Sequence, residues 1–320
     1  MTDTAFRPLP QPTNADGDPR LTGVEIELGG LPEDEVAAIV AEVLNGTAHQ
    51  DDTTIWTVRD TDIGDVEVYL DTALRKASAS TFRDAGLTLG REVVPVEIVT
   101  EPLDAKGLDR LDHLRAVLCD RGALGSTSAW YFGFGVHLNV EIASTDTSDI
   151  LRPLLAYALI EDWMRAARPI DESRNALPFT DPYPTAFVRH LVELGRDASL
   201  SDLIDLYLGD TPSRNRGLDM LPIFAHLDED RVTAKIGTDT AVTARPTFHF
   251  RLPDCRIDDP DWTLVTEWDR WRLVEQIAAS DDLLDKLGTA YVDAHQGITL
   301  FRSDWAKECG KLLGGLGGTS

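Results

Sequence analysis

The sequence predicts an α+β fold in which a curved, mainly antiparallel sheet lines a polar cleft with one face and packs helices against its other, apolar face. Three observations favour this fold. Several segments alternate apolar and polar residues with the two-residue period of half-buried strands. A short turn joins two of these segments in the manner of a hairpin. Amphipathic helical stretches stand between the strands and after them.

The length of the chain allows one large domain. A chain of 320 residues can bury about three quarters of the surface that its unfolded form exposes. We expect residues 1–20, with four prolines among polar residues, to be a flexible leader. Residues 21–313 then form a single domain with a helical insertion at about residues 148–210, and the glycine-rich residues 314–320 form a flexible tail.

Charge and cysteine content exclude several classes of protein. The 30 basic and 55 acidic side chains give a formal charge of −25, which repels nucleic acids and anionic membranes. No apolar run is long enough for a signal peptide or a membrane span. Three cysteines at wide spacings form no disulfide framework or zinc motif. We therefore expect a cytoplasmic protein that binds neither nucleic acid nor membrane.

The strand at residues 21–28 is the first element of the expected sheet. Alternation sends Glu25 and Glu27 to one face and three aliphatic side chains to the other. Two neighbouring carboxylates lie in water, pair with cations or coordinate a hard metal. An ordinary exposed strand explains this pair on its own, so its meaning depends on whether other strands bring matching polar faces.

The next elements alternate between helix and strand. A helix begins at Pro32 and stops at Gly46, because acidic residues fill its first turn and glycine ends it. Strands at 54–60 and 65–71 form a hairpin, and the second carries Glu67 on an acidic face. The apolar strand at 93–99 carries a single carboxylate, Glu97. A helix follows at about 108–121.

Further polar groups lie on the later strands. The strand at 129–142 places His137 and Asn139 on one face. Helices are expected at 148–167, 186–194 and 200–208. Turn-rich loops near them carry arginines that suit planar oxyanions, although each arginine by itself is more simply a solvated loop residue: Arg174, Arg214 and Arg216.

The last strand and the helical C-terminal part complete the expected fold. At residues 245–252 one face of a strand carries Arg245, His249 and Arg251. Residues 261–313 are mostly helical, and the tryptophans there pack on the sheet. Carboxylates with histidine suit Mg²⁺ or Mn²⁺, and arginines suit a phosphoryl group that these metals bridge. The sequence holds no P-loop, no dinucleotide fingerprint and no motif of a zinc protease or serine hydrolase.

Short segments spread over residues 21–280 resemble the amidoligases of the glutamine synthetase and glutamate-cysteine ligase superfamily of carboxylate-amine ligases. Each segment is short, and the resemblance depends on their order and approximate spacing. Besides the loops around Arg174 and Arg214, the segments are Gly23-Val-Glu-Ile-Glu27, Trp56-Thr-Val-Arg-Asp60, Val96-Glu-Ile-Val-Thr100, Gly135-Val-His-Leu-Asn139 and Thr247-Phe-His-Phe-Arg251.

The resemblance implies a glutamine synthetase-like catalytic fold and an ATP-dependent ligase. Mg²⁺ or Mn²⁺ would hold ATP, a small-molecule or peptide carboxylate would take the γ-phosphoryl group, and an amine would displace phosphate to leave an amide or isopeptide bond. By position, the resemblance implies metal ligands at Glu25, Glu27, Glu97, His137 and His249. It implies cofactor contacts at Asn139, Arg245, Asp60 and Glu67, and catalytic arginines at Arg251, Arg214, Arg216 and Arg174.

The chain departs from the family pattern at two positions. Relatives usually have glutamate where this chain has His249, and a second histidine where it has Asn139. Imidazole binds Mn²⁺ or Zn²⁺ but is a poorer ligand for Mg²⁺. Besides an active ligase, two readings therefore stay open: a family member that binds peptide or nucleotide without catalysis, and a metal-dependent hydrolase that uses the same carboxylates without ATP.

Overall fold

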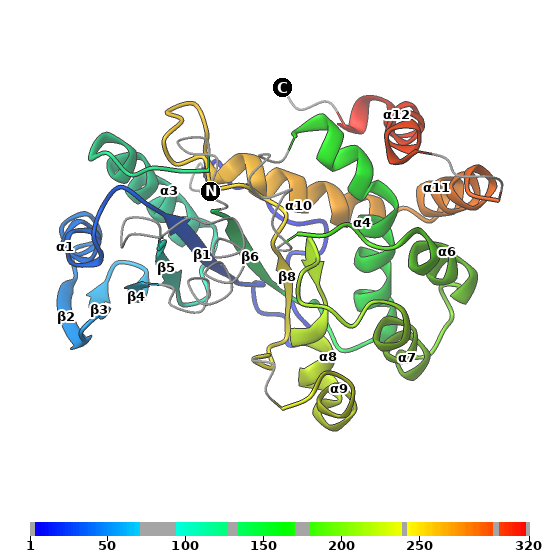
Figure 1. The fold of residues 1–320 in the computed structure, drawn as a ribbon, viewed down its shortest axis with the longest axis horizontal. Helices are drawn as coiled ribbons and strands as arrows, with labels where there is room; N and C mark the ends of the chain where they lie inside the picture. The colour runs from blue at the N-terminus through cyan, green and yellow to red at the C-terminus, as the bar shows by residue number, and fades with distance from the viewer. Residues whose placement is uncertain are drawn as a thin grey trace, which may run out of the picture.

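One open, curved antiparallel sheet forms the centre of the protein (Figure 1). The computed structural model describes residues 4–70, 94–126, 134–169, 180–238, 242–296 and 301–317. Within these ranges the sheet has eight strands in the order β2-β3-β4-β5-β1-β6-β8-β7. The strands are β1 (Thr22–Leu28), β2 (Thr47–Asp52), β3 (Ile55–Thr61), β4 (Gly64–Leu70), β5 (Val96–Thr100), β6 (Val136–Glu141), β7 (Leu218–Asp219) and β8 (Thr247–Phe250). The predicted α+β class is confirmed.

Strand β1 occupies a central position between β5 and β6. Its aliphatic residues Val24, Ile26 and Leu28 are completely buried, as the two-residue alternation predicts. Glu27 lies opposite Glu97 of β5 in the sheet register. Glu25 and Glu27, which alternate with these aliphatic residues, therefore lie on the other, polar face of the sheet.

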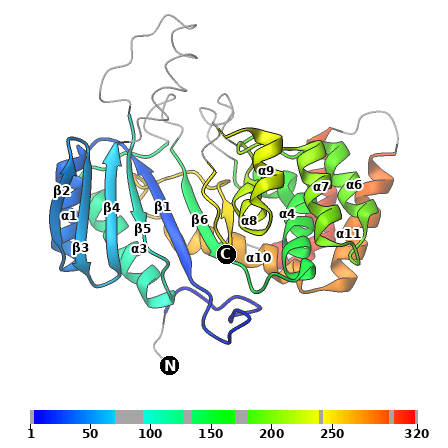
Figure 2. The ribbon, with the colours of Figure 1, turned by 90° about the horizontal axis from the view of Figure 1, so that it is seen from below.

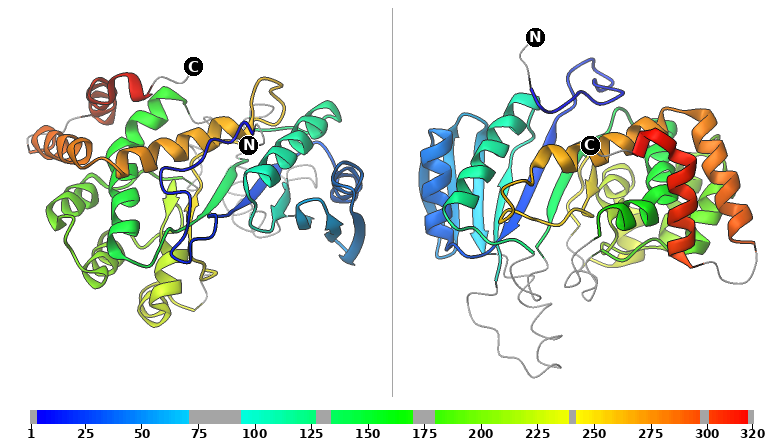
Figure 3. Two further views of the ribbon diagram at one scale, coloured as in Figure 1. Left: turned by 180° about the vertical axis from the view of Figure 1, so that it is seen from behind. Right: turned by 90° about the horizontal axis from the view of Figure 1, so that it is seen from above.

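Three helices cover the apolar face of the sheet (Figure 3). They are α1 (Glu33–Leu44), α3 (Ala105–Asp120) and α10 (Leu264–Ala278). Helix α1 has three acidic residues in its first turn and ends at Asn45, which takes the left-handed conformation with φ 58°. The ring of Trp271 on α10 packs against Phe248 and Phe250 of β8, with ring centroids 5.0 and 5.6 Å apart. The expectation that this tryptophan packs on the sheet is confirmed.

The remaining helices form a second layer beside β8 (Figure 2). They are α4 (Thr147–Ala167), α6 (Thr185–Leu194), α7 (Leu200–Asp210), α8 (Leu221–Leu227), α9 (Glu229–Ile236), α11 (Asp281–Ala294) and α12 (Arg302–Leu313), and Gly314–Gly317 form a 3₁₀ turn. The central part of helix α4 is buried. It packs against α10, α11 and α12 and links this layer to the back of the sheet. None of the helices in the described ranges has the length and apolar character needed to cross a membrane.

The structure adds two strands that the sequence pattern does not predict, the short β7 and the longer β2. Strand β2 is polar and largely exposed along its length, so no apolar alternation indicates it. It pairs with β3 through backbone hydrogen bonds and forms one edge of the sheet.

The segment at residues 4–20 also differs from the expectation of a flexible leader. Phe6 and Leu9 are buried, and Phe6 contacts the Trp268 ring at 6.2 Å between centroids. Arg20 forms a buried ion pair with Glu275 of α10 at 2.8 Å. The described part of this segment is therefore packed on α10, because two apolar side chains and one arginine anchor it.

Candidate functional site

The five predicted metal ligands lie together on the polar face of the sheet. Two overlapping groups have their ligand atoms within 4.8 Å of one another: Glu25, His137 and His249 in one, and Glu27, Glu97 and His137 in the other. Apart from Glu25, which is partly buried, these side chains are buried. Such a concentration of carboxylate oxygens and imidazole nitrogens is suited to a divalent cation.

The sheet register brings these side chains together. Glu27 of β1 lies opposite Glu97 of β5, and Glu25 lies opposite His137 of β6. Residues that are directly opposite in an antiparallel pair point to the same face with their Cβ atoms about 5 Å apart. Two buried carboxylates at that distance repel each other unless a cation or a proton compensates. A divalent cation bound between Glu27 and Glu97 would supply this compensation.

His137 is held by Glu25. Its Nδ1 atom lies 2.8 Å from Glu25 Oε2. An ionised carboxylate can only accept, so we assign the hydrogen to Nδ1, which donates to Glu25. The Nε2 atom then carries a lone pair and lies 4.0 Å from Glu27 Oε1, beyond hydrogen-bond distance. The other oxygen of Glu27 accepts from the backbone N–H of Gly135 at 2.6 Å.

Asn139 links Glu25 to His249. Its Nδ2 atom donates to Glu25 Oε1 at 2.9 Å, and its Oδ1 atom lies 2.7 Å from Nδ1 of His249. The amide oxygen can only accept, so His249 donates from Nδ1 and keeps the lone pair on Nε2. Both histidines thus have the tautomer in which Nε2 can bind a metal.

The electrostatics of the face favour an ionised Glu25 and a neutral His249. Burial alone would raise the pKa of Glu25, but the hydrogen bond from His137 and favourable electrostatic interactions with His249, His137 and Arg245 outweigh it and hold the pKa well below its usual value. Burial lowers the pKa of His249 well below its usual value, although the Glu25 charge opposes the shift. The carboxylate and the neutral imidazole are the forms that coordinate metal ions.

Arginines lie beside the carboxylates on the β8 side. Arg245 donates from a terminal nitrogen to Glu25 Oε1 at 3.3 Å. Arg251 follows β8 and donates to the backbone carbonyl of Arg214. Nε of Arg214 lies 3.8 Å from the carboxylate of Asp219 on β7. The structure thus brings three of the predicted arginines next to the histidines and carboxylates.

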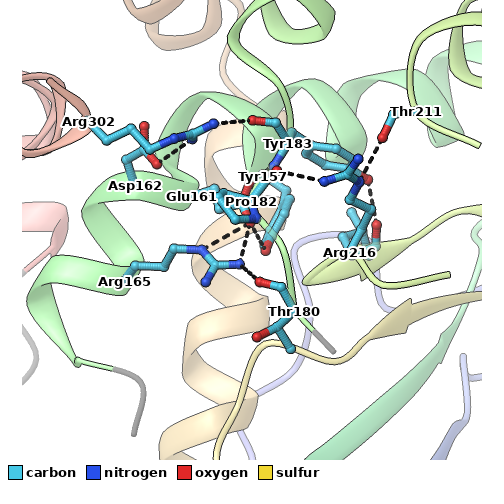
Figure 4. Close-up of polar contacts among 11 residues, drawn as sticks. Tyr157, Glu161, Asp162, Arg165, Thr180, Pro182, Tyr183, Thr211, Arg216 and Arg302 are labelled. Atoms are coloured by element: carbon cyan, nitrogen blue, oxygen red, sulfur yellow. Dashed lines mark hydrogen bonds and ion pairs between the residues drawn. The ribbon is translucent and has the colours of Figure 1, made fainter. Parts of the chain in front are cut away.

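Arg216 points to a different set of partners (Figure 4). Its Nε donates to the Thr211 hydroxyl at 2.7 Å, and a terminal nitrogen donates to the Pro182 carbonyl at 2.8 Å. Beside it, the buried carboxylate of Glu161 accepts from Tyr157, Arg165 and the backbone of Tyr183. Arg216 therefore holds two loops together in this structure. Arg174 lies outside the described residues.

Two predicted cofactor contacts lie farther along the sheet. Glu67 of β4 is exposed, and it shares a row of the sheet with Glu25, separated by Val99 of β5. Asp60 lies near the end of β3, where the pairing with β4 is irregular, and it has a positive φ of 56°. Its backbone N–H donates to Asp65 at 3.2 Å. A role of either residue in binding a nucleotide stays a prediction.

Asp219 is the residue of this face that sequence reasoning missed. It is completely buried and lies opposite His249 in the register of β7 and β8. Burial raises its pKa to about 6, although Arg251, the Leu221 N–H, Arg214 and Arg245 oppose the shift. Strand β7 has only two residues, so no alternation of side chains indicates it.

Comparison with known proteins gives one match. The model of a family described as "Putative amidoligase enzyme" matches residues 18–273. This range contains all the side chains of the polar face named above, from Glu25 on β1 to Arg251 after β8. No curated protein and no solved structure matches significantly.

Proposed function

This chain belongs to the amidoligase family, and from that membership we propose that it is an ATP-dependent carboxylate-amine ligase that requires Mg²⁺ or Mn²⁺. The family description supports a ligase-type enzyme. The finer proposal is that a carboxylate and an amine, on small molecules or peptides, are joined into an amide or isopeptide bond through an acyl phosphate.

One observation carries the proposal: carboxylates, histidines and arginines from β1, β5, β6 and β8 share one face of the sheet. The two groups of ligand atoms within 4.8 Å of one another suit the cation that accompanies ATP. The arginines lie immediately beside them, with Arg245 bonded to Glu25 itself. Phosphoryl transfer needs this combination, because its transition state spreads negative charge over several oxygens.

The donor set fits a divalent metal ion. Glu25, Glu27 and Glu97 supply carboxylate oxygens, and His137 and His249 supply Nε2 lone pairs. Imidazole donors favour Mn²⁺ over Mg²⁺, so we expect Mn²⁺ to be the better activator. When bound, the ion would neutralise charge on the phosphates of ATP.

The residues of the chain have separate tasks in this proposal. Arg251 and Arg214 bind the transferring phosphoryl group and, after transfer, the acyl phosphate. In the first step a carboxylate oxygen of the substrate attacks the γ-phosphorus of ATP, and ADP leaves with the electrons of the broken P–O bond. In the second step the amine attacks the acyl carbon, phosphate leaves, and the amine loses one proton. Asn139 keeps Glu25 and His249 in place throughout.

The experiment that tests the proposal measures ADP release from purified protein. We expect ADP only when a metal ion, ATP, a carboxylate and an amine are all present, and we expect Glu27→Gln to abolish its release. A Glu27→Gln variant with full turnover would refute the assignment of the metal ligands. Release of product from an amide without any ATP requirement would favour a hydrolase instead.

A further inference from the structure

Asp219 has one oxygen fixed by the backbone and one directed at an arginine. Its Oδ1 accepts from the N–H of Leu221 at 2.9 Å, at the start of α8. Its Oδ2 is buried and has no hydrogen-bond partner among the described residues, but it lies 3.8 Å from Nε of Arg214. A completely buried carboxylate is costly unless a positive charge compensates it. Arg214, in ion-pair contact, and the nearby Arg251 and Arg245 supply that charge.

Arg214 has a buried edge and an exposed part. Its Nε atom is buried, whereas the side chain as a whole is 36% exposed. The edge that faces Asp219 is therefore turned inward while part of the side chain reaches the surface. At 3.8 Å the contact with Asp219 is an ion pair and not a hydrogen bond. The attraction of Asp219 for this edge favours one orientation of the planar fork, which is the arrangement that suits recognition of an oxyanion.

The backbone around Asp219 is also fixed. The Tyr183 hydroxyl donates to the carbonyl of Leu218 at 2.5 Å, and the N–H of Met220 donates to the Tyr207 hydroxyl at 3.3 Å. The carbonyl of Gly217 accepts from the N–H groups of both residues that follow β8. The backbone of Asp219 is thus held by several hydrogen bonds, and from this fixed position its carboxylate attracts a more exposed arginine.

We propose that Asp219 is a positioning residue that holds Arg214 in the orientation that binds the phosphate chain of the nucleotide. The proposal rests on the proposed function, because it assigns the oxyanion to the same site. It goes further by giving a role to a buried carboxylate that would otherwise only repel that anion. The role is indirect: Asp219 acts through Arg214 and does not contact the ligand.

This role is tested by whether Asp219→Asn strengthens or weakens the binding of a polyphosphate anion. The probe is inorganic tripolyphosphate in a buffer that contains Mn²⁺, and calorimetry at slightly alkaline pH measures its dissociation constant. Neutralising a carboxylate near an anion site strengthens anion binding if the charge acts only through space. If Asp219 positions Arg214, Asp219→Asn weakens binding instead, by about tenfold.

A double-mutant cycle with Arg214→Gln shows whether the effect passes through Arg214. We expect Asp219→Asn to change the affinity in the wild-type background and to have little further effect in the Arg214→Gln background. The matched control is Glu275→Gln, which neutralises a buried carboxylate paired with Arg20 behind the sheet. It is expected to lower the unfolding temperature and leave the affinity for tripolyphosphate unchanged.

Three outcomes would overturn the proposal. They are equal or tighter binding by Asp219→Asn, additive effects of the two substitutions, and no binding of tripolyphosphate by the wild-type protein. Failure of the ligase proposal gives a different result, in which the cycle shows coupling but no combination of acid and amine supports release of ADP from ATP.

Discussion

Asn139 connects two of the expected metal ligands on the polar face. Its amide joins Glu25 to His249 through one donated and one accepted hydrogen bond. It thereby fixes which nitrogen of His249 carries the hydrogen. The imidazole comes from β8 and the amide that holds it comes from β6, so Asn139 and His249 act as a pair.

Asn139→Ala is therefore expected to weaken Mn²⁺ binding by about 10- to 100-fold. The substitution releases the Glu25 and His249 side chains from their orientation while leaving all five expected ligands in the chain. Calorimetric titration with Mn²⁺ measures the effect. Asn14→Ala is the control. Asn14 also donates its amide to a glutamate, Glu141, at 3.1 Å, but it lies in the N-terminal segment at residues 4–20. Equal losses in both variants would contradict the role of Asn139.

The stability of the protein should depend on pH through Asp219. Its pKa in the folded state is about 6, above the value of 3.8 for a free side chain, so the folded protein holds this proton more tightly than the unfolded chain. Stability therefore falls as pH rises through this window and levels off above about pH 6. The charged and titratable groups around Asp219 are Arg214, Arg245, Arg251, Tyr207 and His249.

Asp219→Asn removes this contribution. Relative to the variant, the wild-type protein should lose about 2 kcal/mol of unfolding free energy between roughly pH 4.5 and pH 7. Urea unfolding at a series of pH values provides the measurement, and it uses the difference between the two proteins so that other titrating groups cancel. Parallel pH curves would mean that Asp219 titrates alike in the folded and unfolded chains.

The loop that leads into β7 depends on close packing against α4. A Cβ atom added at Gly217 would overlap the Tyr157 hydroxyl and lie 3.3 Å from Glu161 Oε1. Tyr157 cannot move away easily, because it is buried and donates to Glu161 at 3.1 Å. The absence of a side chain at Gly217 therefore lets the segment with Arg214 and Arg216 approach α4.

Gly217→Ala should accordingly destabilise the protein by about 1–3 kcal/mol and weaken anion binding, because it displaces the arginine loop. Gly209→Ala on the neighbouring helix α7 is the control. A Cβ atom there meets nothing within 4 Å, and alanine is favoured over glycine within a helix by up to about 1 kcal/mol. Denaturant unfolding measures the free energy of unfolding of both variants. Similar values would show that the close approach at Gly217 does not contribute to stability.

The strands that carry the site could be predicted where alternation extends over several residues. On β1 the period of two correctly separates Glu25 and Glu27 from the buried aliphatic residues, and the same logic places His137 with Asn139. Strand β2 has no such pattern, because neither of its faces is buried. Alternation does not identify Asp219, because β7 is only two residues long and its position follows from pairing with β8.

The directions in which the loop arginines point could not be predicted from the sequence. Arg214 and Arg216 are two residues apart in the same loop, and the family resemblance implies a catalytic role for both. In the structure Arg214 faces Asp219, whereas Arg216 joins Thr211 to Pro182. These directions depend on where the fold places Asp219, Thr211 and Pro182 around the loop, so no local pattern distinguishes the two arginines. A catalytic role for Arg216 stays a prediction, and its observed contacts favour a structural one.

At the scale of the whole molecule, the sheet separates two kinds of environment. Its apolar face packs on α1, α3 and α10, and its polar face gathers acidic, histidine and arginine side chains from both halves of the chain. Glu25 and Arg245 are 220 residues apart and lie in one hydrogen-bonded contact. The candidate site therefore exists only when the entire sheet is formed, which accounts for a family match that spans most of the chain.

The central claim is that this face transfers a phosphoryl group from ATP to a carboxylate and then joins the acyl group to an amine. Once an acid and an amine that support ADP release are found, the acid is labelled with oxygen-18 in its carboxylate, and mass spectrometry analyses the released phosphate. The account predicts one labelled oxygen in each phosphate formed with product. Phosphate that takes its new oxygen from water alone would contradict it.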